Sequence, residues 1–293
     1  MNRIELVEVS PRDGLQNEPR TLATEDKLEL IRRAIAAGAR RLEVASFVHP
    51  EKVPQMADAE AVVACLPRGA ARYVGLVLNK RGALRALETA VDEIGLVCAA
   101  SDTFGMRNQG MDAQASLDMA CDVLRFCQEQ GRPAQATIAV AFGCPFEGAV
   151  DPARVVAMAR RIAAAGSIEV AIADTIGIAR PGEVEVLAVQ VADAIAPLPL
   201  RVHFHDTRGM GVANVMAAVR AGAVTVDAAI GGTGGCPFAP GAAGNVASED
   251  VAYALGDAMP VDIVQLVEAA GWLNAKLGRD RTSAIARALG AAR

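Results

Sequence analysis

The sequence predicts an α/β protein built as a single (β/α)₈ TIM barrel with a helical extension at its C-terminus. Short apolar segments alternate eight times with longer amphipathic segments, and the connections between them are short. The apolar segments are nearly continuous, as expected for parallel strands that are buried on both faces. An open doubly wound sheet is the alternative that the same alternation allows.

The individual elements follow from the hydrophobic pattern and from its flanking residues. The expected strands cover residues 4–9, 41–44, 72–78, 93–99, 134–142, 168–173, 199–205 and 224–230. The expected helices cover residues 24–38, 57–66, 81–91, 112–131, 152–165, 181–195, 209–221 and 247–257. Thr24 is expected to cap the first helix, and Gly38, Gly131 and Gly166 are expected to end three helices. We assign residues 1–260 to the barrel and residues 261–293 to the helical extension packed on it.

Composition excludes several classes of partner. The chain has 293 residues, a net charge of −5 and a pI of about 5.4. Its two tyrosines and one tryptophan offer no platform on which bases could stack. Nucleic acid is therefore not expected as a partner. No segment reaches the roughly 18–20 apolar residues of a membrane helix, and the N-terminus leads directly into a strand pattern. The six cysteines form no CxxC pair, which favours reduced thiols, and we expect a cytoplasmic protein.

Two of the three histidines of the chain, His203 and His205, lie in one tripeptide at the end of an apolar run. Side chains alternate along a strand, so both imidazoles project from the same face. Two imidazoles a few residues apart on one face suit a single divalent cation. A pair of strand-end histidines that only make hydrogen bonds remains the alternative at this point.

Further polar residues follow the expected strands where their carboxyl ends would meet in a barrel. They are Arg12, Asp13, Ser46, Ser101, Asp174 and Thr175, together with Glu43 inside the second strand and the glycine-rich segment 231–245. No such set is evident at the amino ends of the strands. This asymmetry predicts one site at the C-terminal face of the barrel.

Several separated segments resemble the motifs of 3-hydroxy-3-methylglutaryl-CoA lyases, in the same order and in register from about residue 4 to 260. These segments are residues 8–18, 46–48, 53–58, 143–148, 174–177, 203–207 and 234–239. That family is a metal-dependent (β/α)₈ lyase family that cleaves a 3-hydroxyacyl-CoA between C2 and C3, giving acetyl-CoA and a 3-oxo acid such as acetoacetate. The resemblance implies leucine catabolism or ketone-body metabolism as the setting, an acyl-CoA thioester as the partner and a homo-oligomer, dimer or tetramer.

The resemblance also implies roles for individual residues. Carried over by motif, the ligands of a Mg²⁺ or Mn²⁺ ion would be Asp13, His203, His205 and Asn245. The catalytic residues would be Arg12 at the thioester, Glu43 orienting Arg12 or the substrate, Asp174 in proton transfer or around the ligands, and Cys236 as the acid/base of a mobile loop. A purely structural pair remains an alternative for Arg12 and Glu43, and an inert loop thiol remains one for Cys236.

The expected substrate-binding residues depart from the family in places. They are Gln16, Ser101, Asn108, Thr137, Arg208 and Met210. Arg208-Gly209-Met210 replaces the usual Tyr-Gly-Gln, and arginine with methionine would favour an extra anionic group or a larger substituent at C3. A lyase for another or larger 3-hydroxyacyl-CoA, a condensing synthase for 2-oxo acids, and a catalytically silent acyl-CoA-binding protein therefore remain alternatives.

Overall fold

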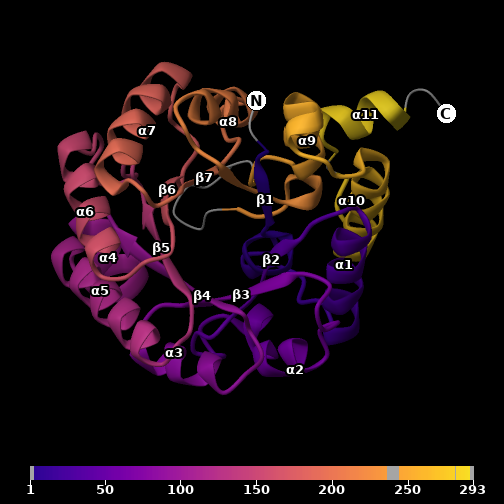
Figure 1. Ribbon diagram of the computed structural model, residues 1–293. Coiled ribbons are helices and arrows are strands. Elements are labelled where there is room, and N and C mark those ends of the chain that lie inside the picture. Colours follow the sequence, from indigo (N-terminus) through magenta and orange to yellow (C-terminus); the bar gives the residue numbers. More distant parts are fainter. Residues whose placement is uncertain (1–2, 236–243, 281, 291–293) are drawn as a thin grey trace.

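The computed structural model describes residues 3–235, 244–280 and 282–290. Within these residues eight parallel strands close into one barrel in which each strand pairs with its neighbours in chain order (Figure 1). The strands are β1 (Glu5–Glu8), β2 (Arg41–Ser46), β3 (Arg72–Val77), β4 (Glu93–Ala99), β5 (Ala134–Ala139), β6 (Val170–Asp174), β7 (Leu200–Phe204) and β8 (Thr225–Ala228). The predicted TIM barrel is confirmed.

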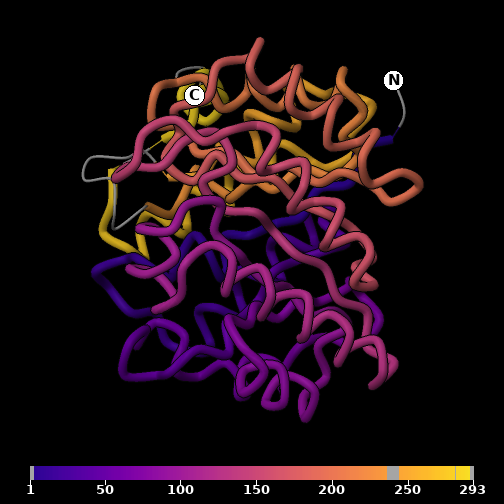
Figure 2. The backbone as a smooth tube through the Cα atoms, turned by 90° about the vertical axis from the view of Figure 1, so that its left-hand side faces the viewer, coloured from indigo at the N-terminus to yellow at the C-terminus, as the bar shows by residue number. Residues whose placement is uncertain are grey.

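Helices surround the strands as a ring. They are α1 (Thr24–Ala36), α2 (Ala59–Ala64), α3 (Lys80–Leu87), α4 (Asp102–Gln109), α5 (Ala113–Glu129), α6 (Pro152–Ala164), α7 (Pro181–Ile195), α8 (Gly211–Arg220), α9 (Ser248–Leu255), α10 (Ile263–Leu277) and α11 (Ala284–Gly290). Short helical turns are η1 (Ser10–Gly14), η2 (Pro54–Met56), η3 (Ile230–Gly232) and η4 (Gly256–Ala258). In the quarter-turned view of Figure 2 most of the first half of the chain lies below and most of the second half above, and the N-terminus itself lies beside the second half.

Two local expectations are wrong. Thr24 is the first helical residue and not the cap, because its Oγ1 donates a hydrogen bond to Asp58 Oδ2 at 2.7 Å while Ala23 takes the capping position. The helix α4, which follows β4, was not among the expected helices. Its sequence is mixed rather than amphipathic, and Gly110 ends it in the left-handed conformation at φ 73°. The predicted helix ends at Gly38, Gly131 and Gly166 agree with their positive φ angles of 105°, 66° and 91°.

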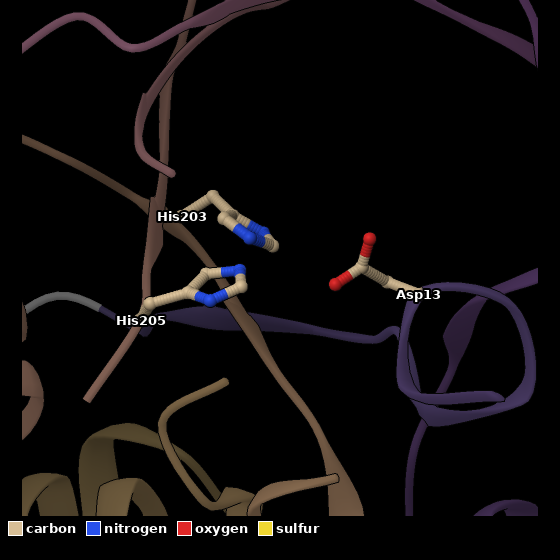
Figure 3. Close-up of side chains that lie close together, drawn as sticks. All are labelled: Asp13, His203 and His205. Carbon is tan, nitrogen blue, oxygen red and sulfur yellow. The ribbon is translucent and has the colours of Figure 1, made fainter. Parts of the chain in front are cut away.

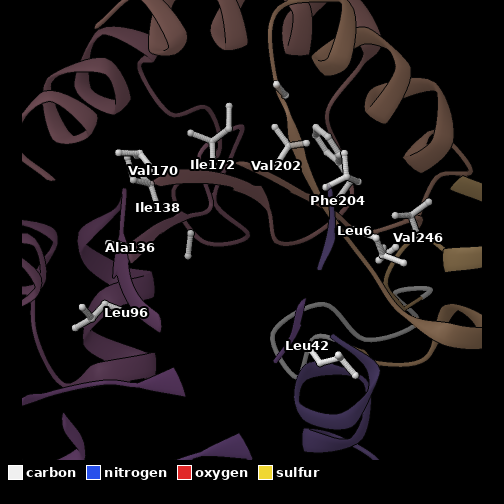
Figure 4. Packing of buried hydrophobic residues seen from close by; sticks show 14 of the residues in the cluster. Leu6, Leu42, Leu96, Ala136, Ile138, Val170, Ile172, Val202, Phe204 and Val246 are labelled. Carbon is white, nitrogen blue, oxygen red and sulfur yellow. The ribbon is translucent and has the colours of Figure 1, made fainter. Parts of the chain in front are cut away.

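Alternation along β7 illustrates how the barrel separates core from site. Leu200, Val202 and Phe204 belong to the hydrophobic core between strands and helices, and Figure 4 shows Val202 and Phe204 in it. Arg201 and His203, at the intervening positions, line a cavity inside the barrel. One strand therefore supplies packing on one face and chemistry on the other.

The C-terminal helices complete the ring. The helix α10 packs against α1, α9 and η3, and α11 packs against α9 (Figure 1). The division at residue 260 into a barrel and an extension stays a prediction. Among the described helices, none has the length and apolar character needed to cross a membrane. Of the described cysteines, Cys65 is exposed and the others are buried free thiols.

Charged residues also gather at the amino ends of the strands, so the expectation of no such set there is wrong. This N-terminal charge cluster consists of Glu5, Arg41, Arg72, Glu93 and Glu169. Arg41 contacts Glu93 at 2.6 Å and Glu169 at 3.0 Å, and Arg72 contacts Glu93 at 3.0 Å and also pairs with Glu5. Most of these residues open their strands, and barrel closure brings strands far apart in the sequence to one end.

Candidate active site

A tight turn after β1 positions Arg12 and Asp13. The chain leaves β1 in the single π-helical turn η1, which has Pro11 near its start. Gly14 ends this turn against the segment after β8, where an added Cβ would lie 2.5 Å from Thr233 Oγ1. Only glycine allows this approach without a shift, so the turn and the β8 segment are held together at the C-terminal face.

The buried carboxylate of Glu8 fixes the same junction. Its Oε1 accepts hydrogen bonds from Ser10 N at 2.9 Å and Ile230 N at 3.1 Å, and its Oε2 accepts one from Ser248 Oγ at 2.6 Å. Burial raises the pKa of Glu8, although these donors act in the opposite direction. Glu8 therefore connects η1, η3 and α9 beneath the site.

Asp13, His203 and His205 converge at this face. One potential ligand atom from each lies within 4.8 Å of the others, and the two imidazole centroids are 5.2 Å apart. Figure 3 shows the carboxylate of Asp13 directed toward both rings. Within the part of the chain that the structure describes, these are three of the four residues expected to bind the metal.

Asn245, the fourth expected ligand, lies beside the cluster. Its Nδ2 donates to Asp13 Oδ2 at 2.7 Å and to Thr233 O at 3.0 Å, and a β-bridge joins it to His205. Among the described residues its buried Oδ1 has no hydrogen-bond partner. Since a half-turn of the amide exchanges its oxygen and nitrogen, Oδ1 can face the cluster in place of Nδ2. A carboxylate, two imidazoles and an amide oxygen form a donor set that fits a divalent cation.

The charges in the cluster support one another. Burial opposes ionisation of Asp13, but Arg12 and the two imidazoles outweigh it, so the pKa of this carboxyl lies below its usual range. Burial also opposes protonation of His203, yet the hydrogen bond to Asp227 and the charge of Asp13 raise its pKa. The site thus keeps an anionic Asp13 carboxylate facing the His203 imidazole, whose surroundings favour positive charge, and a bound cation would satisfy the same balance.

Arg12 is held in place by two carboxylates. Its Nη1 donates to Asp13 Oδ1 at 2.6 Å, and its guanidinium also pairs with Glu43, which is 2% exposed. Burial opposes the charge of Arg12, but Glu43 and Asp13 raise its pKa, so it stays cationic. The expected Arg12–Glu43 contact is present, and it is compatible both with an orienting role and with a structural one.

A cavity of about 150 Å³ opens above these groups. Gln16, Asn108 and Thr137 line it as expected for substrate-binding residues. Its remaining lining is partly apolar and includes Val48, Leu76, Leu78, Val97, Phe104, Ala139 and Ala173. The cavity therefore combines an ionic floor with an apolar wall.

Two expected site residues do not line the cavity. Asp174 accepts hydrogen bonds from Ile178 N at 3.0 Å and Ala179 N at 2.9 Å, and burial raises its pKa. Ser101 is buried at the start of α4, outside the lining of the cavity.

Arg208 and Met210 do not line the cavity either. Both border a separate pocket beside residues 178–181, where Arg208 donates to Gly177 O at 3.1 Å and Met210 is 41% exposed. Cys236 lies outside the described residues. Substrate contact by Ser101, Arg208 and Met210 stays a prediction that the cavity does not support.

Sequence reasoning missed Asp227 and Arg201. Asp227 Oδ2 lies 3.1 Å from His203 Nδ1, and its Oδ1 accepts a hydrogen bond from Arg201 Nε at 2.5 Å. The signal was present: Arg201 precedes His203 by two residues and so shares its face, and Asp227 is a charged residue within an apolar strand.

Comparisons with known proteins identify the family of the chain. The chain is 40% identical to an (R)-citramalyl-CoA lyase of Chloroflexus aurantiacus, over 98% of this chain and 95% of the relative. It is also 40% identical to a 3-hydroxy-3-isohexenylglutaryl-CoA/hydroxymethylglutaryl-CoA lyase of Pseudomonas aeruginosa, over 98% and 97%. The crystal structure of a hydroxymethylglutaryl-CoA lyase from Pseudomonas aeruginosa superimposes with a TM-score of 0.94 at 39% identity, covering 100% of this chain and 99% of that one. The model of the HMGL-like family matches residues 3–271, and the chain therefore belongs to this family of carbon–carbon lyases.

Proposed function

We propose that the protein is a divalent-metal-dependent lyase that cleaves 3-hydroxy-3-methylglutaryl-CoA, or a close analogue, to acetyl-CoA and a 3-oxo acid. The observation that carries the proposal is the cluster of Asp13, His203 and His205 beside the buried, cationic Arg12 at one cavity. Asn245 would complete the ligand set for Mg²⁺ or Mn²⁺. A cation at this position would lower the pKa of a substrate hydroxyl bound to it.

The residues around the cluster suit the bond cleavage. The C3 hydroxyl gives up its proton and becomes the carbonyl of the 3-oxo acid, while the electrons of the C2–C3 bond pass into the thioester. Negative charge then develops on the thioester oxygen, where Arg12, fixed by Glu43 and Asp13, would stabilise it. C2 finally takes up a proton to give acetyl-CoA.

Cys236 is the proposed acid/base, an assignment that rests on the resemblance of residues 234–239. A thiol with an ordinary pKa near 8.5 can exchange protons near neutrality, whereas a hydroxyl does so poorly. Cys236→Ser should therefore retain substrate binding and bound cation but slow turnover by roughly a hundredfold or more. Turnover equal to that of the parent protein would make Cys236 a bystander.

A basic groove next to the cavity supports an acyl-CoA as the substrate. Lys52, Arg81, Arg85 and Arg107 line this groove of about 990 Å³, and no Asp or Glu of the described residues does so. It shares Gln16, Asn17, Val48, Leu78 and Asn108 with the cavity. In a chain of net charge −5, an acid-free groove continuous with the site favours a phosphate-bearing carrier.

A larger C3 substituent is the second candidate, because the far wall of the cavity is apolar. Leu76 and Val97 come from β3 and β4, across the barrel from β7, and Thr137, Ala139 and Ala173 are small. Such a wall leaves space for an alkyl group and offers no partner for a charge. The pocket therefore favours the larger substituent over the more acidic one.

The test is acetyl-CoA release from a panel of 3-hydroxyacyl-CoA thioesters with Mg²⁺ or Mn²⁺ added. We expect cation-dependent cleavage of 3-hydroxy-3-methylglutaryl-CoA and of homologues with longer C3 alkyl groups. A panel with no cation-dependent cleavage would refute the proposal and favour a silent acyl-CoA-binding protein.

Pantetheine thioesters test the carrier separately. Arg81→Ala with Lys52→Ala should raise KM for the CoA thioester by roughly tenfold. The same variant should leave KM for the pantetheine thioester unchanged, because that substrate lacks the nucleotide phosphates. Arg125→Ala, which removes an exposed arginine paired with Asp122, is the matched control.

A further inference from the structure

We propose that Arg201 and Asp227 are positioning residues that fix the ring orientation and the tautomer of His203, so that His203 presents Nε2 to a cation. The inference rests on the proposed metal site. It concerns residues to which neither the family motifs nor the proposed chemistry assigns a role.

Asp227 occupies one nitrogen of His203. It lies on β8 in direct register with His203 on β7, and its Oδ2 is 3.1 Å from Nδ1. An ionised carboxylate can only accept hydrogen bonds, so the contact requires a proton on Nδ1. The lone pair of the neutral ring is then on Nε2, the nitrogen left for the cluster with Asp13 and His205.

Arg201 in turn holds Asp227. Its Nε donates to Asp227 Oδ1, the oxygen that does not contact His203, so the two donors fix both ends of the carboxylate. Arg201 and His203 are two residues apart on the same inward face of β7. Arg201 is 1% exposed and Asp227 is 4% exposed, so bulk water has little access to either partner.

Fold stability alone does not account for this pair. A buried ion pair is often no more stabilising than well-packed apolar residues, because desolvation offsets the attraction. The Nη1 of Arg201 has no hydrogen-bond partner among the described residues, and Glu169 is 3.9 Å away. Arg201 thus leaves its Nη1 without a hydrogen bond while its Nε binds Asp227. This arrangement is expected if the function of Arg201 is to hold that carboxylate.

Histidine ¹⁵N NMR of the metal-free protein tests the tautomer directly. The chain has three histidines, His49, His203 and His205, so three single substitutions assign every signal. At a pH where the rings are neutral, we expect His203 to carry its proton on Nδ1 alone. The double variant Arg201→Met/Asp227→Asn should populate both tautomers, because the amide can turn either its oxygen or its nitrogen toward the ring.

Mn²⁺ titration of the metal-free protein measures the consequence. The double variant removes both charges together and leaves no unpaired buried charge, so it should fold. Its Mn²⁺ affinity should be about ten- to a hundredfold weaker than that of the parent protein. Arg201→Lys, which keeps a cation beside Asp227, should retain the Nδ1 tautomer and lose about threefold or less. Lys27→Met/Asp58→Asn removes another ion pair with a buried lysine and should leave the affinity unchanged.

The outcomes separate this inference from the metal proposal. If the double variant keeps both the Nδ1 tautomer and the parent affinity for Mn²⁺, the positioning role is refuted. If the parent protein binds no Mn²⁺, the metal proposal fails, while the tautomer of His203 still decides whether Asp227 sets the ring. If the double variant does not fold, the NMR and the Mn²⁺ titration are carried out on Asp227→Asn. The same mixture of tautomers and the same loss of Mn²⁺ affinity are expected.

Discussion

The two ends of the barrel both hold buried charges, but they use them differently. At the amino ends of the strands, Arg41 bridges Glu93 and Glu169, and Arg72 bridges Glu93 and Glu5. At the carboxyl ends, Asp13, His203 and His205 direct their ligand atoms toward one another beside a cavity. The first end contains satisfied ion pairs, whereas the second gathers groups that a substrate or cation would complete.

The comparison shows that the burial of charged side chains does not by itself identify a binding or catalytic site. A site is identified instead by side chains whose unused hydrogen-bonding or ligand atoms are directed toward the same space. The ligand atoms of Asp13, His203 and His205 lie within 4.8 Å of one another in this way, while the carboxylates around Arg41 already have partners. Substitutions at the two ends should therefore differ in their effects on turnover and on stability.

The largest effect is expected for His203→Ala. Loss of one imidazole should abolish stoichiometric Mn²⁺ and lower turnover by about a thousandfold or more, because the cation would supply several kcal/mol of barrier lowering. Bound metal is measured by elemental analysis after gel filtration. Undiminished metal stoichiometry would remove His203 from the ligand set.

Arg41→Met should act on stability alone. It removes the nearest cation of the buried Glu169 and leaves Glu93 with only the half-exposed Arg72, which should cost about 3–5 kcal/mol of unfolding free energy, while kcat and Mn²⁺ affinity of the folded protein stay unchanged. Urea unfolding and steady-state kinetics measure the two effects. Arg32→Met, exposed on α1, is the control and should change stability by about 0.5 kcal/mol or less. A loss of kcat in Arg41→Met would mean that the amino end contributes to catalysis.

Arg12→Gln should show the opposite pattern. Without a fixed cation at the developing enolate oxygen, kcat should fall by about a hundred- to a thousandfold, as for other charge-stabilising donors. Mn²⁺ affinity should remain, since Arg12 is not one of the proposed ligands. If kcat hardly changes and only the unfolding free energy falls, the Arg12–Glu43 pair is structural.

Glu249, near the C-terminal face of the barrel, should make the stability of the protein depend on pH. Burial raises the pKa of Glu249 to about 7, although Gly231 N and Ser283 donate hydrogen bonds to its carboxyl group. Because the folded-state pKa lies above the ordinary value of 4.5, the stability that the carboxyl contributes is full below pH 4.5 and is lost as the pH rises to about 7. Between pH 4.5 and 7 the free energy of unfolding of the parent protein should fall by roughly 3 kcal/mol or less relative to that of Glu249→Gln. Urea unfolding of both proteins at the two ends of this pH range measures the difference. Unfolding free energies that change in parallel with pH in the two proteins would contradict the prediction.

The smallest effect is expected for Arg208→Tyr/Met210→Gln. Since both residues border a pocket separate from the cavity, the relative kcat/KM values within the thioester panel should change by less than about twofold. A clear shift toward 3-hydroxy-3-methylglutaryl-CoA would show that these residues reach the substrate, as the sequence suggested.

Much of the architecture was determined by the sequence. The alternation of apolar and amphipathic segments predicted the barrel, because parallel strands buried on both faces must be apolar and each needs a helical return. The spacing of His203 and His205 predicted a shared face, because side chains alternate along a strand whatever surrounds it. Both inferences depend on local geometry, which a sequence carries directly.

Contacts between distant segments were decided only by the tertiary structure. The sequence gives no register between β7 and β8, so it could not indicate that Asp227 meets His203 or that Arg201 meets Asp227. Likewise, Arg208 and Met210 follow His205 closely in the chain, yet the turn after β7 carries them to a different pocket. Proximity along a chain predicts contact only within a regular element. Beyond it, barrel closure and packing determine which side chains meet, and those are properties of the whole fold.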